Sequence, residues 1–157
     1  MKRQLVSFFK GFVYAFNGIA ATVKSERNFR FHIVTAIYVY AFSAFYEFTA
    51  TEYALITICV FSVFAAEIMN SAVERCAAKP DKEHDAFAGM AKDMAAGAVL
   101  ITAFGSAVCG VLLFWNVTVF KKIFAFFTNG FLPLFILLLT LAAAFLFVFK
   151  GGKKKSD

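Results

Sequence analysis

The segment YALITICVFSVFAAEIMNSAV, residues 53–73, decides the fold class of this chain. It carries a single charge, Glu67, and a helix needs about 20 mostly apolar residues to cross a bilayer. Three further runs meet or approach this length, at residues 31–48, 94–115 and 131–149. The sequence therefore predicts an all-α integral membrane protein with four spans.

The overall composition agrees with a membrane location. Hydrophobic residues make up 61% of the chain, whereas a soluble domain is closer to half apolar. The net charge of +6 does not indicate nucleic-acid binding, because no basic face of a soluble fold is apparent and the lysines and arginines flank the apolar runs instead. The three cysteines lack metal-ligand spacing, so we expect neither a zinc site nor a disulfide framework.

Two segments outside the spans have a different pattern. Residues 4–25 repeat phenylalanines at steps of one, three and four among basic residues, which predicts an amphipathic helix in the membrane interface. The alternative is an ordinary packed helix. Residues 117–127 form a second, shorter surface segment of the same kind.

The distribution of lysine and arginine predicts the orientation. With four spans and both termini in the cytoplasm, fourteen of the sixteen basic residues lie on the cytoplasmic side. The opposite orientation would place the same fourteen outside. The 74–93 loop is therefore expected in the cytoplasm, where ATP and Mg²⁺ are available.

A polar cluster lies at the cytoplasmic end of the 53–73 run. Glu67, Asn70, Ser71 and Glu74 share one helical face, and the two carboxylates are about 10 Å apart along the axis. An ionised carboxylate at the depth of Glu67 costs several kcal/mol unless it is paired, hydrated or protonated. Such residues more often serve function than structure.

The two carboxylates suit different roles. Glu74 lies at the water boundary and suits Mg²⁺, which binds a few carboxylates together with water and phosphate oxygens. Glu67 lies deeper and suits a general base that acts on a lipid hydroxyl. Two non-enzymatic interpretations remain. In the first, Glu67 pairs helices in an oligomer. In the second, the protein is a proton or ion transporter, although a proton relay normally needs more than one acid deep in the spans.

Three charged residues near the same membrane face extend the candidate site. Lys92 and Asp93 open the third span, and Lys92 suits a phosphate group, although a lysine at a span end also snorkels to the interface without any further role. Glu26 precedes the first span and by itself reads as a solvated surface charge.

The chain resembles the prokaryotic diacylglycerol kinase family, which includes the undecaprenol kinases. The resemblance runs from about Tyr14 to about Trp115. It rests on four motifs whose order and spacing make the match specific: YAFNGI (14–19), ERNFRFH (26–32), EIMNSAVE (67–74) and AKDMAAGAVL (91–100). The second and fourth motifs look more like those of undecaprenol kinases.

The resemblance implies a fold and an activity. The expected fold is an N-terminal amphipathic helix and a three-helix transmembrane kinase core within residues 1–115, followed by an additional transmembrane helix and a basic tail within 116–157. The expected reaction is ATP- and Mg²⁺-dependent phosphorylation of undecaprenol, or alternatively of diacylglycerol to phosphatidic acid. The family is homotrimeric, with sites between subunits in the bacterial inner membrane. No G-x-x-x-x-G-K-S/T sequence is present, which agrees with a kinase that lacks a P-loop.

The resemblance also implies residue roles. Glu67 becomes the catalytic base, Glu26 and Glu74 the Mg²⁺ ligands, and Asn70 a support for the active site. The nucleotide-binding positions are Tyr14, Glu26, Glu74, Glu83, His84, Asp85, Lys92 and Asp93. The chain departs from the family at Ala78, a commonly acidic position, and in the loop KPDKEHDAF (79–87), where the histidine lies at an unusual distance from Lys92.

Overall fold

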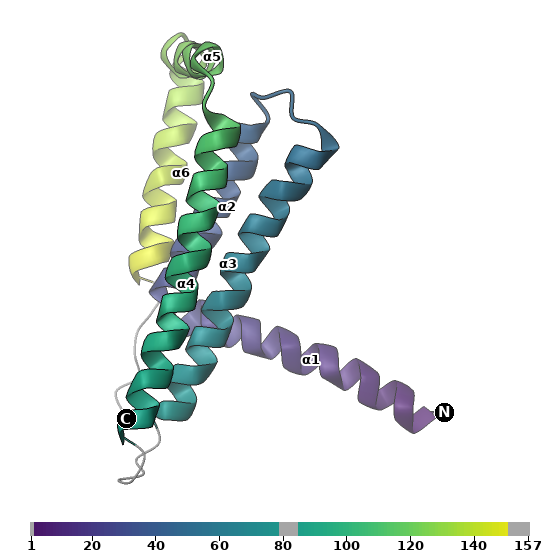
Figure 1. The fold of residues 1–157 in the computed structure, drawn as a ribbon. Coiled ribbons are helices and arrows are strands. Elements are labelled where there is room, and N and C mark those ends of the chain that lie inside the picture. The colour runs from purple at the N-terminus through teal and green to yellow at the C-terminus, as the bar shows by residue number, and fades with distance from the viewer. Residues whose placement is uncertain (1, 79–84, 151–157) are drawn as a thin grey trace.

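The computed structural model describes residues 2–78 and 85–150, and these residues form helices without any strand. The helices are α1 (Lys2–Ser25), α2 (Arg27–Ser43), α3 (Ala50–Ala77), α4 (Asp85–Phe114), α5 (Val117–Thr128) and α6 (Phe131–Lys150). In Figure 1, α2, α3, α4 and α6 run alongside one another, and α1 leaves this bundle as a separate arm. The predicted all-α membrane architecture is confirmed.

Three helices of the described part of the chain are long and apolar enough to span a membrane, namely α3, α4 from Phe87 onward, and α6. They correspond to the spans predicted at 53–73, 94–115 and 131–149. Both α3 and α4 extend further than predicted at the end that carries the polar cluster. Lys92 and Asp93 therefore lie inside α4 rather than ahead of it.

The predicted first span was wrong at its far end. The helix α2 has 17 residues and stops at Ser43 instead of continuing to 48, so it is about 25 Å long. The chain turns there because Tyr46 donates a hydrogen bond of 2.7 Å to the carbonyl oxygen of Phe114 at the end of α4. The rings of Tyr46 and Phe48 also pack on Phe114. Apolar residues continue through this turn, so hydropathy alone could not locate the helix end.

The start of α3 has a local cause. Thr49 Oγ1 accepts a hydrogen bond from the Glu52 backbone N–H, and Glu52 Oε2 accepts one from the Thr49 N–H. This reciprocal capping box satisfies two N–H groups that the helix end would otherwise leave unpaired.

The helices α3 and α4 pack closely along much of their length. Ser106 Oγ donates to the carbonyl oxygen of Cys59 at 3.3 Å, so a side chain of α4 reaches the backbone of α3. Gly110, four residues further along, has no neighbour within 4 Å of the position of a Cβ, so the close approach of α3 and α4 does not depend on this glycine. Most other apolar side chains of α4 are exposed, as expected of a surface covered by lipid or by another subunit.

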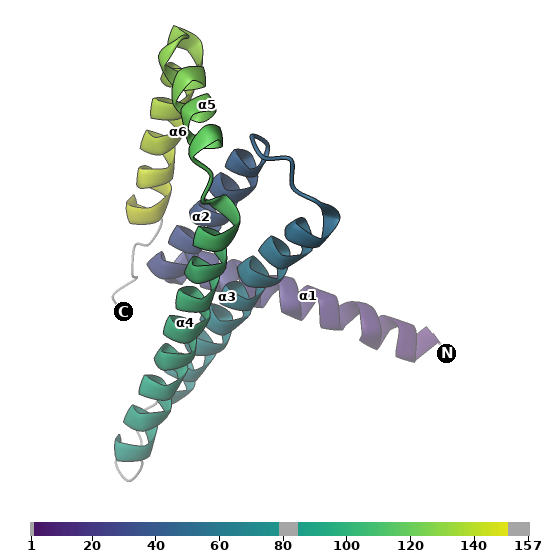
Figure 2. The same cartoon turned by 45° about the horizontal axis from the view of Figure 1, so that its top comes forward.

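The two segments predicted to be amphipathic surface elements are both helical. In α1 the phenylalanines of residues 8–20 are exposed, with Phe16 at 69%, so their apolar face has no protein cover. In α5, Asn116 Oδ1 caps the helix by accepting from the N–H groups of Thr118 and Val119. Figure 2 shows α5 next to α6 at the end of the bundle opposite α1.

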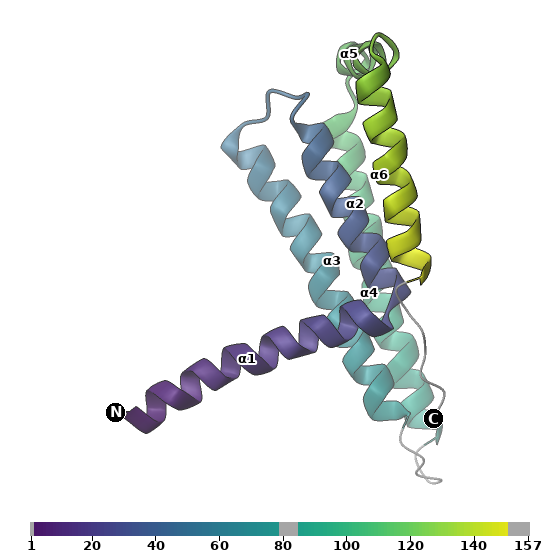
Figure 3. The same ribbon diagram turned by 180° about the vertical axis from the view of Figure 1, so that it is seen from behind.

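The ends of the helices sort into two groups. The start of α2 and the ends of α1 and α6 meet, and α3 and α4 continue past that level (Figure 3). The turn after α2 and the helix α5 lie at the opposite end. Glu26, just before α2, and the predicted site residues on α3 and α4 therefore belong to one end of the bundle.

Candidate active site

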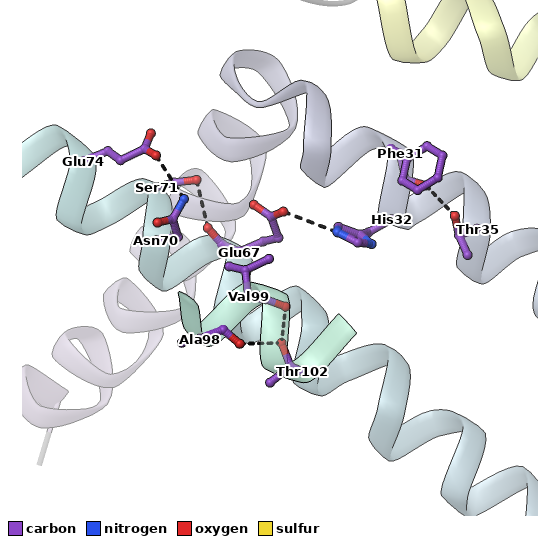
Figure 4. A network of polar contacts seen from close by, with 10 residues as sticks. All are labelled: Phe31, His32, Thr35, Glu67, Asn70, Ser71, Glu74, Ala98, Val99 and Thr102. Atoms are coloured by element: carbon purple, nitrogen blue, oxygen red, sulfur yellow. Dashed lines mark hydrogen bonds and ion pairs between the residues drawn. The ribbon is translucent and has the colours of Figure 1, made fainter. Parts of the chain in front are cut away.

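The central residue of the site is Glu67, a carboxylate buried inside the helix bundle. Its residue is 3% exposed, and its Oε1 lies 3.4 Å from Nε2 of His32 on α2. Figure 4 shows the two side chains pointing toward each other from their helices. This contact gives the buried carboxyl group a polar partner from a neighbouring helix.

The burial of Glu67 follows from helical periodicity. Ile56, Val63, Glu67 and Ser71 are the buried residues of α3, and their spacing of four and seven places them on one stripe. This stripe faces the rest of the bundle. Ser71 Oγ donates to the backbone carbonyl of Glu67 at 2.9 Å, so the serine satisfies itself within α3 and leaves the carboxylate free for His32.

One turn nearer the end of α3, Asn70 and Glu74 form a second polar pair. Asn70 Nδ2 donates to Glu74 Oε1 at 3.1 Å (Figure 4). Asn70 Oδ1 is buried and, among the described residues, accepts no hydrogen bond. A buried acceptor without a partner is uncommon and costs free energy. A donor or a cation at this position would satisfy it.

A contact between helices involves the sequence neighbours of Glu26 and Glu74. Arg75 Nη2 donates to Ser25 Oγ at 2.6 Å and to the carbonyl oxygen of Ala21 at 3.4 Å. This contact joins the end of α3 to the end of α1, and Glu74 and Glu26 are each one residue away from it. The Glu26 side chain does not cap α2, so its carboxylate is not used in that helix.

The remaining predicted residues are not joined to the Glu67 and Glu74 pairs. Tyr14 is 70% exposed on α1, and Lys92 and Asp93 are exposed on α4. Within the described chain, no hydrogen bond or ion pair links them to these carboxylates. Glu83 and His84 lie outside the described residues, and Asp85 is placed only as the first residue of α4.

A complete metal site is not assembled by the described residues of one chain. No three side chains from His, Cys, Asp and Glu come together in that part of the molecule. The available oxygen atoms near Glu74 are its own carboxylate and Asn70 Oδ1. These are hard oxygen donors of the kind that Mg²⁺ prefers.

His32 is the residue of the site that the sequence patterns did not single out. It is part of the ERNFRFH motif, but nothing in the periodicity of α2 shows which neighbouring helix it faces. Its partner is 35 positions away, and only the packing of α2 against α3 brings them together. The sequence offered one indication of this pair: a histidine and a glutamate lie at similar depth in two neighbouring predicted spans.

An apolar cavity opens beside this pair. It has a volume of about 580 Å³ and is lined by α2, α3 and α4. Phe31 and His32 lie at the end near Glu67, and Trp115 and Phe120 lie at the far end of the bundle. The cavity therefore has one polar side chain of the pair, His32, at one end of an otherwise almost entirely apolar lining, which suits an amphiphile with a small polar head.

Comparisons with known proteins agree with the motifs. A family model described as prokaryotic diacylglycerol kinase matches residues 13–114. An undecaprenol kinase of Bacillus subtilis (strain 168) is 36% identical over 113 residues, which cover 72% of this chain and 92% of that protein.

Two diacylglycerol kinases are more distant relatives. That of Synechocystis sp. is 30% identical over 63% of this chain and 57% of its own length. That of Escherichia coli (strain K12) is 28% identical over 66% of this chain and 84% of its own length. No solved structure matches the chain. The match to the family model ends at Phe114, so α5 and α6 lie beyond it.

Proposed function

This chain belongs to the prokaryotic diacylglycerol kinase family, and we propose that it transfers the γ-phosphoryl group of ATP to undecaprenol. Family membership favours a membrane lipid kinase over the two non-enzymatic readings of Glu67. The observation that carries the proposal is the buried Glu67–His32 pair at the mouth of an apolar cavity. A lipid alcohol can place its hydroxyl at this pair and its tail in the cavity.

Each side chain then has a chemical task. Glu67 accepts the proton of the lipid hydroxyl while the hydroxyl oxygen attacks the γ-phosphorus. A new P–O bond forms to the lipid, and the bond to the bridging oxygen of ADP breaks. His32 holds the Glu67 carboxylate in one orientation, so it acts as a positioning residue. Because phosphoryl transfer requires little covalent chemistry from the protein, such positioning accounts for much of the rate.

The oxygen atoms near Glu74 fit Mg²⁺. Glu74 and Asn70 Oδ1 would hold the ion, and Glu26 would join them from the start of α2. The ion they hold would neutralise charge on the phosphates of ATP. Lys92 would add a positive charge at the phosphates, and Tyr14, Asp93, Glu83, His84 and Asp85 would contact the nucleotide by analogy with the family. Because one chain leaves the set incomplete, we place the full site between subunits of a homotrimer.

The proposed membrane orientation follows the distribution of basic residues. Both termini and the site end of the bundle face the cytoplasm of a bacterial cell, where Mg-ATP is available. The arm α1 would lie in the interface with its exposed phenylalanines in lipid. Residues 1–115 would form the kinase domain, and residues 116–157 would add a linker, the fourth span α6 and a basic tail.

Undecaprenol is favoured over diacylglycerol by similarity. The named undecaprenol kinase shares more identity with this chain, and over a larger share of its own length, than the named diacylglycerol kinases. The lining of the cavity is almost entirely apolar, which suits the hydrocarbon part of either lipid alcohol. Diacylglycerol stays the second candidate because two of the relatives are named for it.

The decisive experiment compares the two lipids with the same purified protein in detergent. We expect kcat/KM with Mg-ATP to be at least about tenfold higher for undecaprenol than for diacylglycerol, a discrimination within reach of an apolar pocket. Label from the γ-phosphate of ATP in the extracted lipid measures both rates. A higher value for diacylglycerol would reassign the substrate, and no phosphorylation of either lipid would contradict a lipid kinase.

His32 provides a test of the positioning role. We expect His32→Ala to lower kcat by about tenfold or more, because it leaves the buried Glu67 carboxyl group without its 3.4 Å partner, and an unpaired buried polar group costs roughly 1–3 kcal/mol. His32→Gln keeps an N–H donor at this position and should recover part of the rate. Thr35→Val is the matched control, since Thr35 lines the same cavity but bonds only to Phe31 of its own helix. A wild-type kcat in His32→Ala would remove the residue from the mechanism.

A further inference from the structure

The helix α6, which lies beyond the match to the family model, is fastened to α2 through a buried arginine. Arg30 lies in the first turn of α2 and is 2% exposed. Its Nε and Nη2 both donate to the carbonyl oxygen of Val148 near the end of α6, at 3.2 and 3.1 Å. This carbonyl is among those that a helix end leaves without an intrahelical partner. The planar fork of arginine suits such a two-donor contact.

The same guanidinium also holds the end of α1. Nη1 of Arg30 donates to the carbonyl oxygen of Val23 at 2.8 Å and to that of Lys24 at 3.3 Å. These are again unpaired carbonyls at a helix C-terminus, where the helix dipole favours a positive charge. One side chain therefore joins the ends of α1 and α6 to the start of α2, at the place where Figure 3 shows the three helices meeting.

Two more contacts hold α6 along α2. The Tyr38 hydroxyl donates to Thr140 Oγ1 at 3.1 Å, midway along both helices. The guanidinium of Arg27 lies 5.6 Å from the centre of the Phe149 ring, within the range of a cation–π interaction. Polar contacts therefore specify the position of α6 against α2 both near the end of α6 and at its middle. Apolar side chains that face lipid would not fix this position by themselves.

The residue at this junction is Glu26. It is the single residue between α1 and α2 and has an extended backbone, with φ −102° and ψ 115°. Its N–H donates to the carbonyl oxygen of Thr22, and its own carbonyl accepts from the N–H of Arg30. The direction of its carboxylate therefore depends on the angle between α1 and α2 that the Arg30 contacts set.

We propose that α6 is a built-in brace that holds the α1–α2 junction through Arg30 and so presents Glu26 to the Mg-nucleotide. Arg30 is a positioning residue in this arrangement. The role of Glu26 rests on the proposed function, whereas the docking of α6 does not. Without α6, the buried guanidinium would keep Nε and Nη2 unpaired, and the junction would rearrange to satisfy them.

The test uses the full chain with a protease recognition sequence inserted between Asn129 and Gly130, in the connection between α5 and α6. After cleavage in detergent, we expect the α6 fragment to co-purify with the rest of the wild-type chain. In Arg30→Gln the fragment should be lost. The Mg²⁺ concentration for half-maximal activity of uncleaved Arg30→Gln should rise several-fold, with the KM for lipid unchanged. Arg30→Lys keeps the positive charge but lacks the planar guanidinium. Its fragment retention and its Mg²⁺ requirement should therefore lie between those of the wild type and Arg30→Gln.

Two further variants sharpen the result. Lys24→Gln removes an exposed charge at the same junction and should keep both the fragment and the wild-type Mg²⁺ dependence. The double variant Thr140→Val/Phe149→Leu weakens docking from the α6 side and leaves Arg30 in place. It should release the fragment and raise the Mg²⁺ requirement, so the test stands even where Arg30→Gln does not fold.

The outcomes separate this proposal from the kinase assignment. Dissociation of α6 from the cleaved wild-type chain would overturn the brace, as would an unchanged Mg²⁺ dependence in a folded Arg30→Gln or in the double variant. Fragment retention is measured without any activity. A wild-type chain that retains α6 but phosphorylates no lipid would therefore refute the kinase proposal and leave the docking of α6 established.

Discussion

Replacement of Glu67 by glutamine is expected to reduce kcat by about 10²–10⁴-fold, the usual contribution of a general base. Glutamine has nearly the same shape and keeps a polar group facing His32, so the bundle should fold normally. It has no basic carboxylate, so the lipid hydroxyl keeps its proton as its oxygen approaches the phosphorus. The measurement is transfer of labelled γ-phosphate to undecaprenol at saturating Mg-ATP and lipid.

Glu47→Gln is the matched control for this variant. Glu47 is exposed in the turn after α2, at the opposite end of the bundle from the site. The Glu47→Gln variant should therefore keep the wild-type rate. That result would show that loss of a carboxylate does not by itself lower activity. If Glu67→Gln phosphorylated every lipid alcohol tested as fast as the wild type, the assignment of the base would be wrong.

Replacement of Glu74 by glutamine should raise the Mg²⁺ concentration for half-maximal activity at least about tenfold. Even groups that only support a metal ligand typically change metal affinity by about 10–100-fold when mutated, and Glu74 is proposed as a direct ligand. Glutamine keeps an acceptor for Asn70 Nδ2, so the local hydrogen bond survives while the negative charge is lost. Titration of activity with Mg²⁺ at fixed ATP gives the result.

The Mg²⁺ titration separates Glu74 from Glu67. Glu67→Gln should lower the maximal rate and keep the Mg²⁺ midpoint, whereas Glu74→Gln should move the midpoint. An unchanged Mg²⁺ dependence in Glu74→Gln would remove this residue from the metal site. A shift of the midpoint in Glu67→Gln would mean that the two carboxylates do not divide the roles as proposed.

Much of the architecture could be predicted from the sequence because membrane spans obey a simple rule. A run of about 20 apolar residues must form a helix that satisfies its own backbone. This rule located α3, α4 and α6. The end of α2 could not be found in this way, because the turn at 44–49 is as aromatic as a span. A hydrogen bond from Tyr46 to the distant Phe114 decides it.

The candidate site could also be predicted only in part. The seven-residue separation of Glu67 and Glu74 follows from the helix period, and it puts one carboxylate deep and the other near the end of α3. The free acceptor on Asn70 and the partner of Glu67 were not predictable, since both depend on which neighbouring helices pack against α3. Glu83 and His84 stay predictions, because they lie outside the described residues.

The sequence by itself determined that this chain is an all-α membrane protein with carboxylates at two depths of one helix, because hydrophobicity and helical period act locally. Only the tertiary structure decided that Glu67 pairs with His32, that α2 stops at Ser43, and that Arg30 ties α6 to the α1–α2 junction. The physical reason is that these contacts join residues 35 to 118 positions apart. Such contacts depend on how whole helices pack, which no local pattern encodes.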